Sequence, residues 1–314
     1  MTQTTAYQTT LRRAVTLTGV GLHRGAPATA TLRPAPVEQG IWFKRVDIDA
    51  VDALVPAQYD RVTDTTLCTL IANESGVTVS TVEHVMAAIA GLGLTNVLVE
   101  VDGPEIPIMD GSAKPFVDAI RSAGIVEQSA LRRAIRVLEP VSVSANGGEA
   151  RLEPAPFFEI DFTIEFDDAA IGRQSRGMRV ANGAFAAHLA DSRTFCRALD
   201  VERMRAAGLA LGGSMENAIV VDADRVLNPE GLRHPDEYVR HKMLDAVGDL
   251  ALAGAPIIGR YVGHRAGHGV TNALLRALFD RPEAWRIETV SPATAPLLPG
   301  FAADRTREGL RRIA

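Results

Sequence analysis

Residues 237–250, EYVRHKMLDAVGDL, combine the spacing of a helix with a line of ionisable side chains. Apolar residues recur at helical intervals and predict an amphipathic helix: Val239, Met243, Leu244, Val247 and Leu250. His241, Asp245 and Asp249 follow one another at four-residue steps, so their side chains lie along one side of that helix. A His–Asp pair at the surface would contribute only about 0.2–0.5 kcal/mol to helix stability. The alternative interpretation is that His241 and Asp245 offer a nitrogen and an oxygen to zinc, which needs a third ligand from elsewhere.

The composition predicts a globular protein that does not bind nucleic acid. Of the 314 residues, 46% are apolar, which suffices for one large domain or two of ordinary size. The net charge of −5 and the dispersed basic residues argue against a nucleic-acid partner. Cys68 and Cys196 lie far apart without a CxxC motif, which argues against a disulfide framework and favours the cytoplasm. No apolar segment approaches the ~20 residues that span a bilayer, so any membrane contact is expected to be peripheral.

A helix–strand–helix order occurs twice, each time after a series of strand-prone segments. The first occurrence comprises residues 80–93, 95–103 and 113–125, and the second comprises residues 236–254, 256–264 and 271–280. The spacing of polar residues also agrees, because His84 precedes Asp110 by nearly the same distance in sequence as His241 precedes His268. The two halves of the chain therefore form a structural pseudo-repeat.

The pseudo-repeat predicts an α+β fold of two domains with a cleft between them. We expect residues 1–128 and 129–314 each to form a mostly antiparallel sheet packed on two helices. Residues 182–233 are too long for a simple connection, so this segment is expected to be functional or to carry structure of its own.

The segment STVEHVMAAIAG, residues 80–91, supplies a candidate for the third ligand. Glu83 and His84 lie near the start of a predicted helix, from which both side chains can reach the space beyond its end. Ser80 and Glu83 also have the spacing of a capping box, in which Glu83 would only satisfy a backbone amide. Two histidines, one aspartate and an adjacent glutamate have the composition of a catalytic zinc site, with a fourth position open to water.

A general acid is also needed, because an amine expelled from an amide must be protonated. His264 and His268, in the glycine-rich segment GHRAGHG, are both candidates. The alternative for either loop histidine is simple exposure to solvent.

Taken together, these segments resemble a known family. Its motifs match TGVGLHRG at 18–25, TTLCTL at 65–70, STVEHVMAAIAGLG at 80–93, EIPIMDGSAKPF at 105–116, SRTF at 192–195, GLALGGSMENAIVVD at 208–222, residues 237–250 and GH at 267–268. From about residue 10 to about residue 290 the chain closely resembles the UDP-3-O-acyl-N-acetylglucosamine deacetylases, zinc amidases of the lipid A pathway in Gram-negative bacteria.

The resemblance implies a role for each candidate. The family's metal ligands fall on His84, His241 and Asp245, its general base on Glu83, and its general acid on His268 rather than His264. Asp249 would pair with His268 and favour the imidazolium form, which answers why three ionisable residues line one side of the helix. Thr194 would help to hold the oxyanion, and Lys242 would contact the substrate. The family fold has two β-α-α-β sandwich domains, each with an insert, here near residues 40–70 and 195–225, and an active site at their interface.

In the family the second insert encloses the fatty-acyl chain of the substrate. The matching apolar residues, with two from the first domain, are Leu22, Leu67, Val201, Ala210, Gly213, Met215, Ala218 and Val220. Phe195 and Asp200 match positions near the substrate. Cys196 and Arg197 depart from the family pattern of glycine and an aromatic residue, which leaves the preferred acyl length open. Cys68 matches a position that could bind a second, inhibitory ion or simply pack as a thiol.

The resemblance therefore implies hydrolysis of the N-acetyl group of UDP-3-O-(3-hydroxyacyl)-N-acetylglucosamine to the free amine and acetate, the committed step of lipid A biosynthesis. Zn²⁺ is the expected cofactor, with Fe²⁺ as an alternative in the cell. We expect a cytoplasmic monomer. Two other hypotheses remain: a zinc amidase acting on a different acylated amine, and a noncatalytic module that binds nucleotide sugars or acyl chains.

Overall fold

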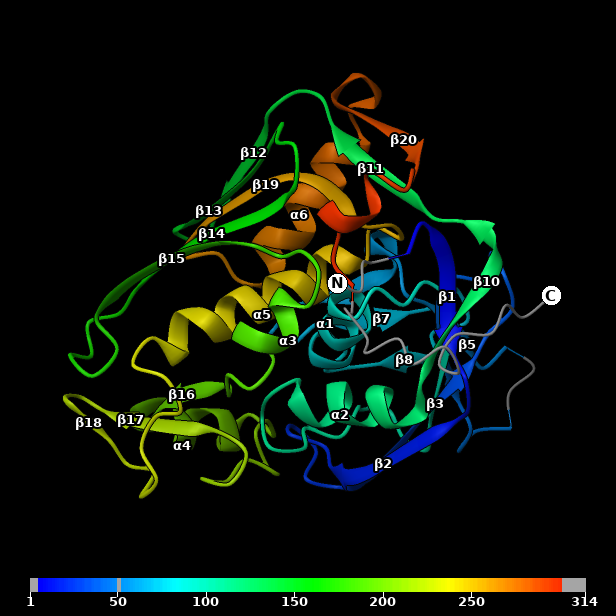
Figure 1. Cartoon of the computed structure of the whole chain (residues 1–314). Coiled ribbons are helices and arrows are strands. Elements are labelled where there is room, and N and C mark those ends of the chain that lie inside the picture. Colours follow the sequence, from blue (N-terminus) through cyan, green and yellow to red (C-terminus); the bar gives the residue numbers. More distant parts are fainter. Residues whose placement is uncertain (1–4, 50–51, 301–314) are drawn as a thin grey trace.

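The structure is a computed structural model that describes residues 5–49 and 52–300. Helices form its middle, and two main sheets lie outside them (Figure 1). Helix α1 (Glu83–Gly91) packs along α5 (Glu237–Ala251), while α2 (Lys114–Ala123) contacts α1 and α6 (His268–Phe279) contacts α5. The predicted α+β class is confirmed.

The first sheet has five strands in the order β2-β3-β9-β4-β5. These strands are β2 (Val15–Val20), β3 (Pro27–Pro34), β9 (Val97–Val101), β4 (Ile41–Arg45) and β5 (Leu54–Pro56). Strand β9 follows α1 in the chain and pairs antiparallel with β3 and parallel with β4. Its alternate residues Val97, Val99 and Val101 are fully buried, as the period of two in a half-buried strand requires.

The second sheet repeats this plan. Its path is β12-β13-β19-β11-β20, and β14 joins β19 and pairs with β15. The strands are β11 (Arg133–Val137), β12 (Val141–Ala145), β13 (Gly148–Glu153), β14 (Phe158–Glu165), β15 (Arg173–Arg179), β19 (Ile257–His264) and β20 (Trp285–Thr289). Strand β19 follows α5 and pairs antiparallel with β13 and parallel with β14. In the first half β9 follows α1 and has the corresponding partners β3 and β4. The pairing supports the pseudo-repeat.

The exact division of the chain into two domains stays a prediction. Strand β10 (Ile125–Leu131) runs across residue 128 and pairs with β1 (Tyr7–Leu11). Strands β4 and β5 belong to the first main sheet, and a separate small sheet follows them. It comprises β6 (Val62–Asp64), β7 (Leu70–Ala72) and β8 (Thr78–Val79), so it extends beyond the predicted first insert at 40–70.

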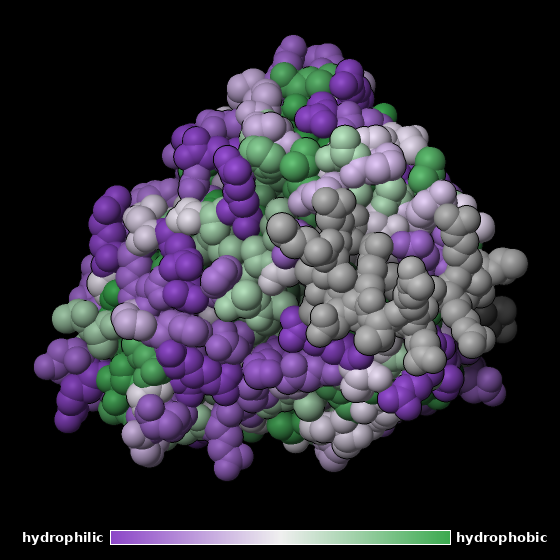
Figure 2. All heavy atoms as spheres, viewed as in Figure 1, coloured by the Kyte–Doolittle hydropathy of each residue, from purple (hydrophilic) through white to green (hydrophobic). Residues whose placement is uncertain are grey.

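The second insert forms a unit of its own beside the helices (Figure 1). After the short helix α3 (Ala184–His188) it comprises β16 (Phe195–Arg197), α4 (Ala198–Ala206), β17 (Ile219–Asp222) and β18 (Arg225–Val226). Hydrophilic side chains cover most of the face seen in Figure 2, with apolar side chains in small scattered areas. Among the described residues, no helix combines the length and apolar character needed to cross a membrane.

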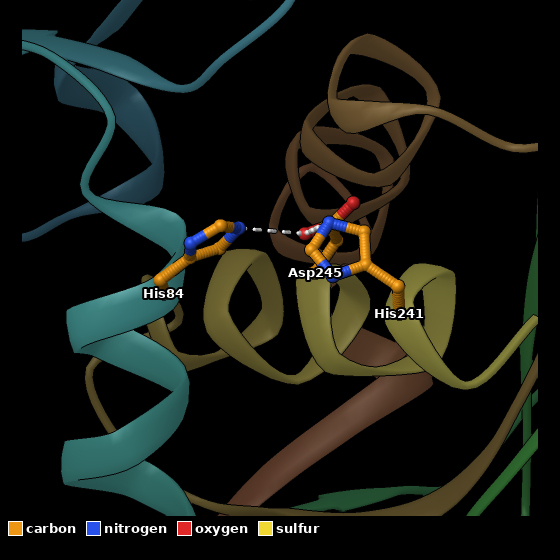
Figure 3. Close-up of side chains that lie close together, drawn as sticks. All are labelled: His84, His241 and Asp245. Carbon is orange, nitrogen blue, oxygen red and sulfur yellow. Dashed lines mark ion pairs between the residues drawn. The ribbon is translucent and has the colours of Figure 1, made fainter. Parts of the chain in front are cut away.

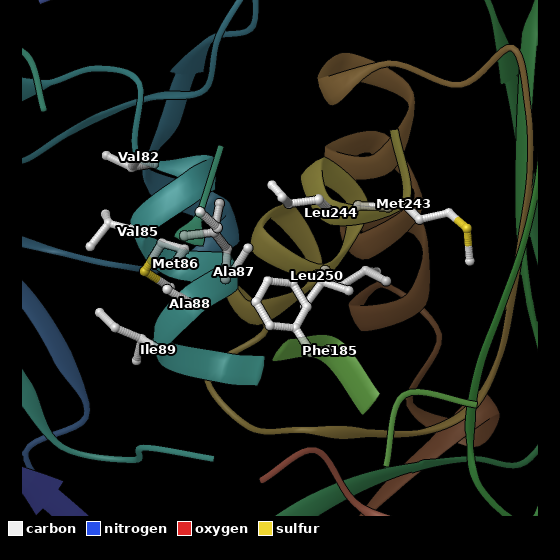
Figure 4. Packing of buried hydrophobic residues seen from close by; sticks show 14 of the residues in the cluster. Val82, Val85, Met86, Ala87, Ala88, Ile89, Phe185, Met243, Leu244 and Leu250 are labelled. Carbon is white, nitrogen blue, oxygen red and sulfur yellow. The ribbon is translucent and has the colours of Figure 1, made fainter. Parts of the chain in front are cut away.

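A helix forms where the spacing predicted one, but α5 is buried on nearly every side, so the prediction that this helix is amphipathic is wrong. Its polar residues Glu237, His241, Asp245 and Asp249 are as deeply buried as its apolar ones. The reason is that α1 packs on the side that a surface helix would expose to water. Figure 4 shows Phe185 of α3 between the two helices near Leu250, while Val85 and Ile89 of α1 and Met243 of α5 point outward into the rest of the core.

Gly248 permits this close packing. A Cβ atom at Gly248 would overlap the carbonyl oxygen of Glu83, so the first turn of α1 can approach α5 only where α5 has no side chain. Glu83 and His84 are thereby brought against the polar residues of α5.

We predict that Gly248→Ala lowers the free energy of unfolding by about 1–3 kcal/mol, because the added methyl group forces two packed helices apart. Urea unfolding followed by circular dichroism measures this loss. Gly103→Ala is the matched control, since a Cβ at Gly103 meets no heavy atom within 4 Å. Equal stability of the two variants would contradict the packing argument.

Candidate active site

His84, His241 and Asp245 converge at the contact between α1 and α5 (Figure 3). All three are buried, and one ligand atom from each lies within 4.8 Å of the others. Nε2 of His84 lies 3.5 Å from Oδ1 of Asp245, and Nε2 of His241 lies 3.3 Å from the same oxygen. Two histidines that are 157 positions apart in the sequence thus face one carboxylate oxygen. Among the described residues this is the one group of three or more that could hold a metal ion.

The surroundings leave these atoms free to bind a cation. Nδ1 of His241 lies 3.0 Å from the carbonyl oxygen of Ser192, which can only accept, so Nδ1 carries the proton and Nε2 keeps its lone pair. Lys242 donates to Oδ2 of Asp245 at 2.6 Å, whereas the buried Oδ1 has no hydrogen-bond partner in the structure. A buried oxygen without a partner is costly unless a cation satisfies it. Two nitrogens and one oxygen form a donor set that suits Zn²⁺.

The protonation states also suit metal binding. Burial lowers the pKa of His241 to about 4, so the imidazole is neutral at pH 7. Burial by itself would raise the pKa of Asp245, but the nearby His241 and Lys242 hold that pKa well below its usual range. A neutral imidazole and a carboxylate are the forms that ligate a metal.

Glu83 and His268 face each other beside this group. Oε1 of Glu83 lies 4.0 Å from Nε2 of His268, and Nδ1 of His268 donates to Oδ2 of Asp249 at 2.8 Å. Burial raises the pKa of Glu83. Burial acts in the opposite direction on His268, but the carboxylates of Asp249, Glu83 and Asp245 outweigh it and raise the pKa of His268 to about 9. The carboxylate of Glu83, with its raised pKa, and the protonated imidazole of His268 therefore lie 4.0 Å apart.

The two alternatives raised by the sequence are decided by geometry. The side chain of Glu83 does not cap α1, because its Oε2 accepts from the backbone amide of Thr69 at 3.0 Å, and the hydroxyl of Ser80 donates to Pro104 instead. His264 lies at the end of β19 with half-exposed side-chain atoms, and its Nε2 is 3.4 Å from Glu165. The structure thus brings His268, and not His264, to the candidate ligands.

The other predicted site residues lie on the insert and on the loops around it. Phe195 presents its ring to His241 and Tyr238, with centroid distances of 6.3 and 5.0 Å. Thr194 is held by backbone hydrogen bonds to Gly111 and Ile219. Asp200 lies 3.6 Å from Arg197, so its carboxylate is already paired.

The residues predicted to line an acyl passage fall into two groups. Leu22 packs near Gly213 and Ala210, because the backbone of the loop at 211–212 hydrogen-bonds to residues 22 and 23. Leu67 and Met215 expose large apolar surfaces, Ala218 is buried, and Val201 and Val220 are half-buried. Contact of these residues with an acyl chain stays a prediction.

Comparison with known proteins assigns the chain. The sequence model of the family described as UDP-3-O-acyl N-acetylglycosamine deacetylase (LpxC) matches residues 8–280. The chain belongs to this deacetylase family. The UDP-3-O-acyl-N-acetylglucosamine deacetylase of Phenylobacterium zucineum is 52% identical over 283 residues, which cover 90% of this chain and 97% of that protein. The protein of the same name from Anaeromyxobacter sp. is 49% identical over 94% of this chain and 97% of its own length. That from Shewanella frigidimarina is 47% identical over 90% of this chain and 92% of its own length.

Within this member of the deacetylase family, Thr69 is a residue whose role sequence reasoning missed. Its backbone amide donates to Glu83, and its hydroxyl donates to Oδ1 of Asp249 at 2.6 Å. Thr69, which lies outside α1 and α5, therefore links Glu83 of α1 to Asp249 of α5, the hydrogen-bond partner of His268. The only sequence indication was its place in the TTLCTL motif, because the contact with Asp249 joins residues 180 positions apart.

A buried ion pair that orients His241 was also missed. The carboxylate of Glu237 accepts from the guanidinium and the backbone amide of Arg193 and from the backbone amide of Arg233. Ser192 directly precedes Arg193 in the chain. The ion pair therefore fixes the carbonyl group of Ser192, to which the ring of His241 is hydrogen-bonded.

Cys68, the other residue for which the sequence left two interpretations, is buried beside Glu83. Burial, assisted by Glu83, raises the pKa of the Cys68 thiol to about 12. Both interpretations of Cys68, a packed thiol and a ligand of a second ion, stay predictions.

We predict that Thr69→Val lowers kcat/KM at least about tenfold, because an isosteric methyl group leaves a buried carboxylate oxygen of Asp249 without its donor. Thr69→Ser keeps the hydroxyl and should retain activity near that of the parent. Steady-state assays test this, with bound metal quantified in each variant. Equal activities of the valine and serine variants would contradict the role of the hydroxyl.

A second prediction concerns pH. We predict that His268 acts as an acid, which works only while protonated, so activity should be present below its pKa of about 9 and be lost as the pH rises through that value. Asp249→Asn removes a negative charge that raises this pKa, and the basic limb of kcat/KM should move toward neutral pH. His264→Gln is the control and should leave the limb in place. A limb that stays near 9 in Asp249→Asn would rule out His268 as the group titrating there.

Proposed function

We propose that this protein is a metal-dependent hydrolase that removes the N-acetyl group of UDP-3-O-(3-hydroxyacyl)-N-acetylglucosamine and releases the free amine and acetate. The observation that carries the proposal is the pairing of Glu83 with His268 at 4.0 Å, next to the converging His84, His241 and Asp245. A base, an acid and a metal site in one place are the groups that hydrolysis of an amide needs. The names of the relatives supply the substrate.

We infer that His84, His241 and Asp245 hold Zn²⁺. When bound, Zn²⁺ supplies a Lewis acid that polarises a carbonyl group and makes hydroxide available near neutral pH. The same donors accept Fe²⁺, so the ion used in the cell depends on metal supply. The hydrogen bond from Lys242 orients Asp245, and the carbonyl group of Ser192 orients His241. Both contacts leave the ligating atoms free.

In the proposed reaction Glu83 takes the proton of the attacking water. Its raised pKa makes this carboxylate a stronger base than an exposed glutamate. His268, kept protonated by Asp249, gives its proton to the departing amine nitrogen. Thr194 is proposed to donate to the oxyanion, and Lys242 to contact the substrate beside Asp245.

The nucleotide is proposed to bind in a pocket that begins at Lys242. Phe166, Arg197, Arg265 and Gly267 also line this pocket, and Gly267 immediately precedes His268. Arg197 is already paired with Asp168 and Asp200, so the guanidinium of Arg265 is the one proposed to meet the diphosphate, and the ring of Phe166 can stack on a base. The acyl chain would extend toward the second insert, where each buried CH₂ contributes about 0.8 kcal/mol. We also propose that the enzyme works in the cytoplasm as a monomer.

The test is Glu83→Ala in the metal-loaded enzyme. This variant should bind metal at near the parent stoichiometry but lose at least about 10²-fold in kcat, because only the proton transfer is removed. Deacetylation of UDP-3-O-acyl-N-acetylglucosamine and metal content measure the two properties. Full activity of Glu83→Ala would end the assignment of the base.

The same assay separates the rival functions. Substrates of graded acyl length, including one without the acyl chain, are compared with the parent enzyme. A deacetylase of this specificity loses activity as the chain shortens. Equal turnover of all substrates would favour an amidase for another acylated amine, and binding without turnover would favour a noncatalytic module.

A further inference from the structure

A second pocket lies where the ends of α1 and α5 meet the two sheets, and none of its lining residues belongs to the candidate active site. It has a volume of about 280 Å³. Its apolar walls are formed by Ile41, Leu94, Phe158, Leu250, Ala253 and Ile257. The pocket thus joins the two halves of the chain. We call it the Arg132 pocket.

Arg132 lines this pocket and is only 2% exposed. Its Nη1 and Nη2 make long hydrogen bonds, of 3.4 and 3.3 Å, to the carbonyl oxygens of Thr5 and Pro299, and its buried Nε has no partner. Within residues 5–49 and 52–300, no carboxylate lies within ion-pair distance of this guanidinium. Burial lowers the pKa of Arg132 to about 10, so the group is still charged at neutral pH.

The other polar groups of the pocket satisfy one another. Arg133 pairs with Glu38, whose carboxylate also accepts from Gln8, and Asn96 donates to Gln8. The charged residues lining the pocket are two arginines and one glutamate, which leaves one positive charge. A buried cation without a counter-ion is costly, and the planar fork of an arginine guanidinium matches the geometry of a carboxylate.

We propose that the Arg132 pocket binds a monocarboxylate with a medium-length alkyl chain, whose carboxylate pairs with Arg132 and whose chain lies against the apolar walls. The charge of Arg132 requires an anionic group on the ligand, and the apolar walls of the pocket require that the rest of the ligand is apolar. This inference is independent of the proposed function, because the pocket shares no residue with that site. Since Ala90 of α1 and Leu250 of α5 both line the pocket, binding should also stabilise the contact between these helices.

Isothermal titration of the full-length, metal-loaded protein with octanoate tests the proposal, with 1-octanol and acetate as matched ligands. Octanoate should bind at least about tenfold more tightly than either, because only octanoate has both the charge and the chain. Arg132→Met should lose the preference for octanoate over octanol, whereas Arg132→Lys should keep part of it. Ala253→Phe should abolish binding of both by filling the pocket. Deacetylase activity should be unchanged in Arg132→Met and Ala253→Phe.

Two outcomes would overturn the proposal. Equal octanoate affinity in the parent, Arg132→Met and Ala253→Phe would place the ligand elsewhere, for example in the acyl passage. The double variant Asp304→Asn, Glu308→Gln removes two carboxylates of the chain's own C-terminal segment, and its octanoate affinity should equal that of the parent. A gain of tenfold or more in this variant would assign the pocket to that segment instead.

Discussion

The contact between the first turn of α1 and Gly248 of α5 is the constraint on which the site depends. It lets the backbone of Glu83 lie against α5, and so it sets how far His84 stands from His241 and Asp245. A larger residue than glycine would separate the two helices before their polar side chains could meet. The strands that precede and follow these helices repeat the same pairing in both halves, so each sheet supports one side of this contact.

That contact buries many ionisable groups, and burial of an unpaired charge costs several kcal/mol. Each buried carboxylate of α5 has at least one partner. Glu237 is paired with Arg193, Asp245 with Lys242, and Asp249 with His268 and Thr69. The remaining oxygen, Oδ1 of Asp245, lacks such a partner, and it is the one toward which both imidazoles point. Among the carboxylate oxygens of Glu237, Asp245 and Asp249, the one without a hydrogen-bond partner thus lies at the proposed metal position.

Residues of one chemical type acquire different properties within this network. The pKa of His241 falls to about 4 because burial dominates, whereas that of His268 rises to about 9 because three carboxylates surround it. The carboxylates divide in the same way, since the pKa of Glu83 is raised and that of Asp245 is held low. Environments that separate the pKa values of like groups are what acid–base chemistry at neutral pH requires.

The sequence by itself indicated the helix–strand–helix order and its repetition, which follow from local periodicity. The spacing of side chains along one helix offered His241 and Asp245 as candidate metal ligands, and the resemblance to the family implied His84 as the third. Only the tertiary structure decided that α5 is buried on its polar side and that β10 pairs with β1 in a small sheet of its own. The link from Thr69 to Asp249 and the unpaired charge of Arg132 also emerged only there. In each case the deciding contact joins segments far apart in the chain, and no local pattern specifies which distant surface will cover a given side chain.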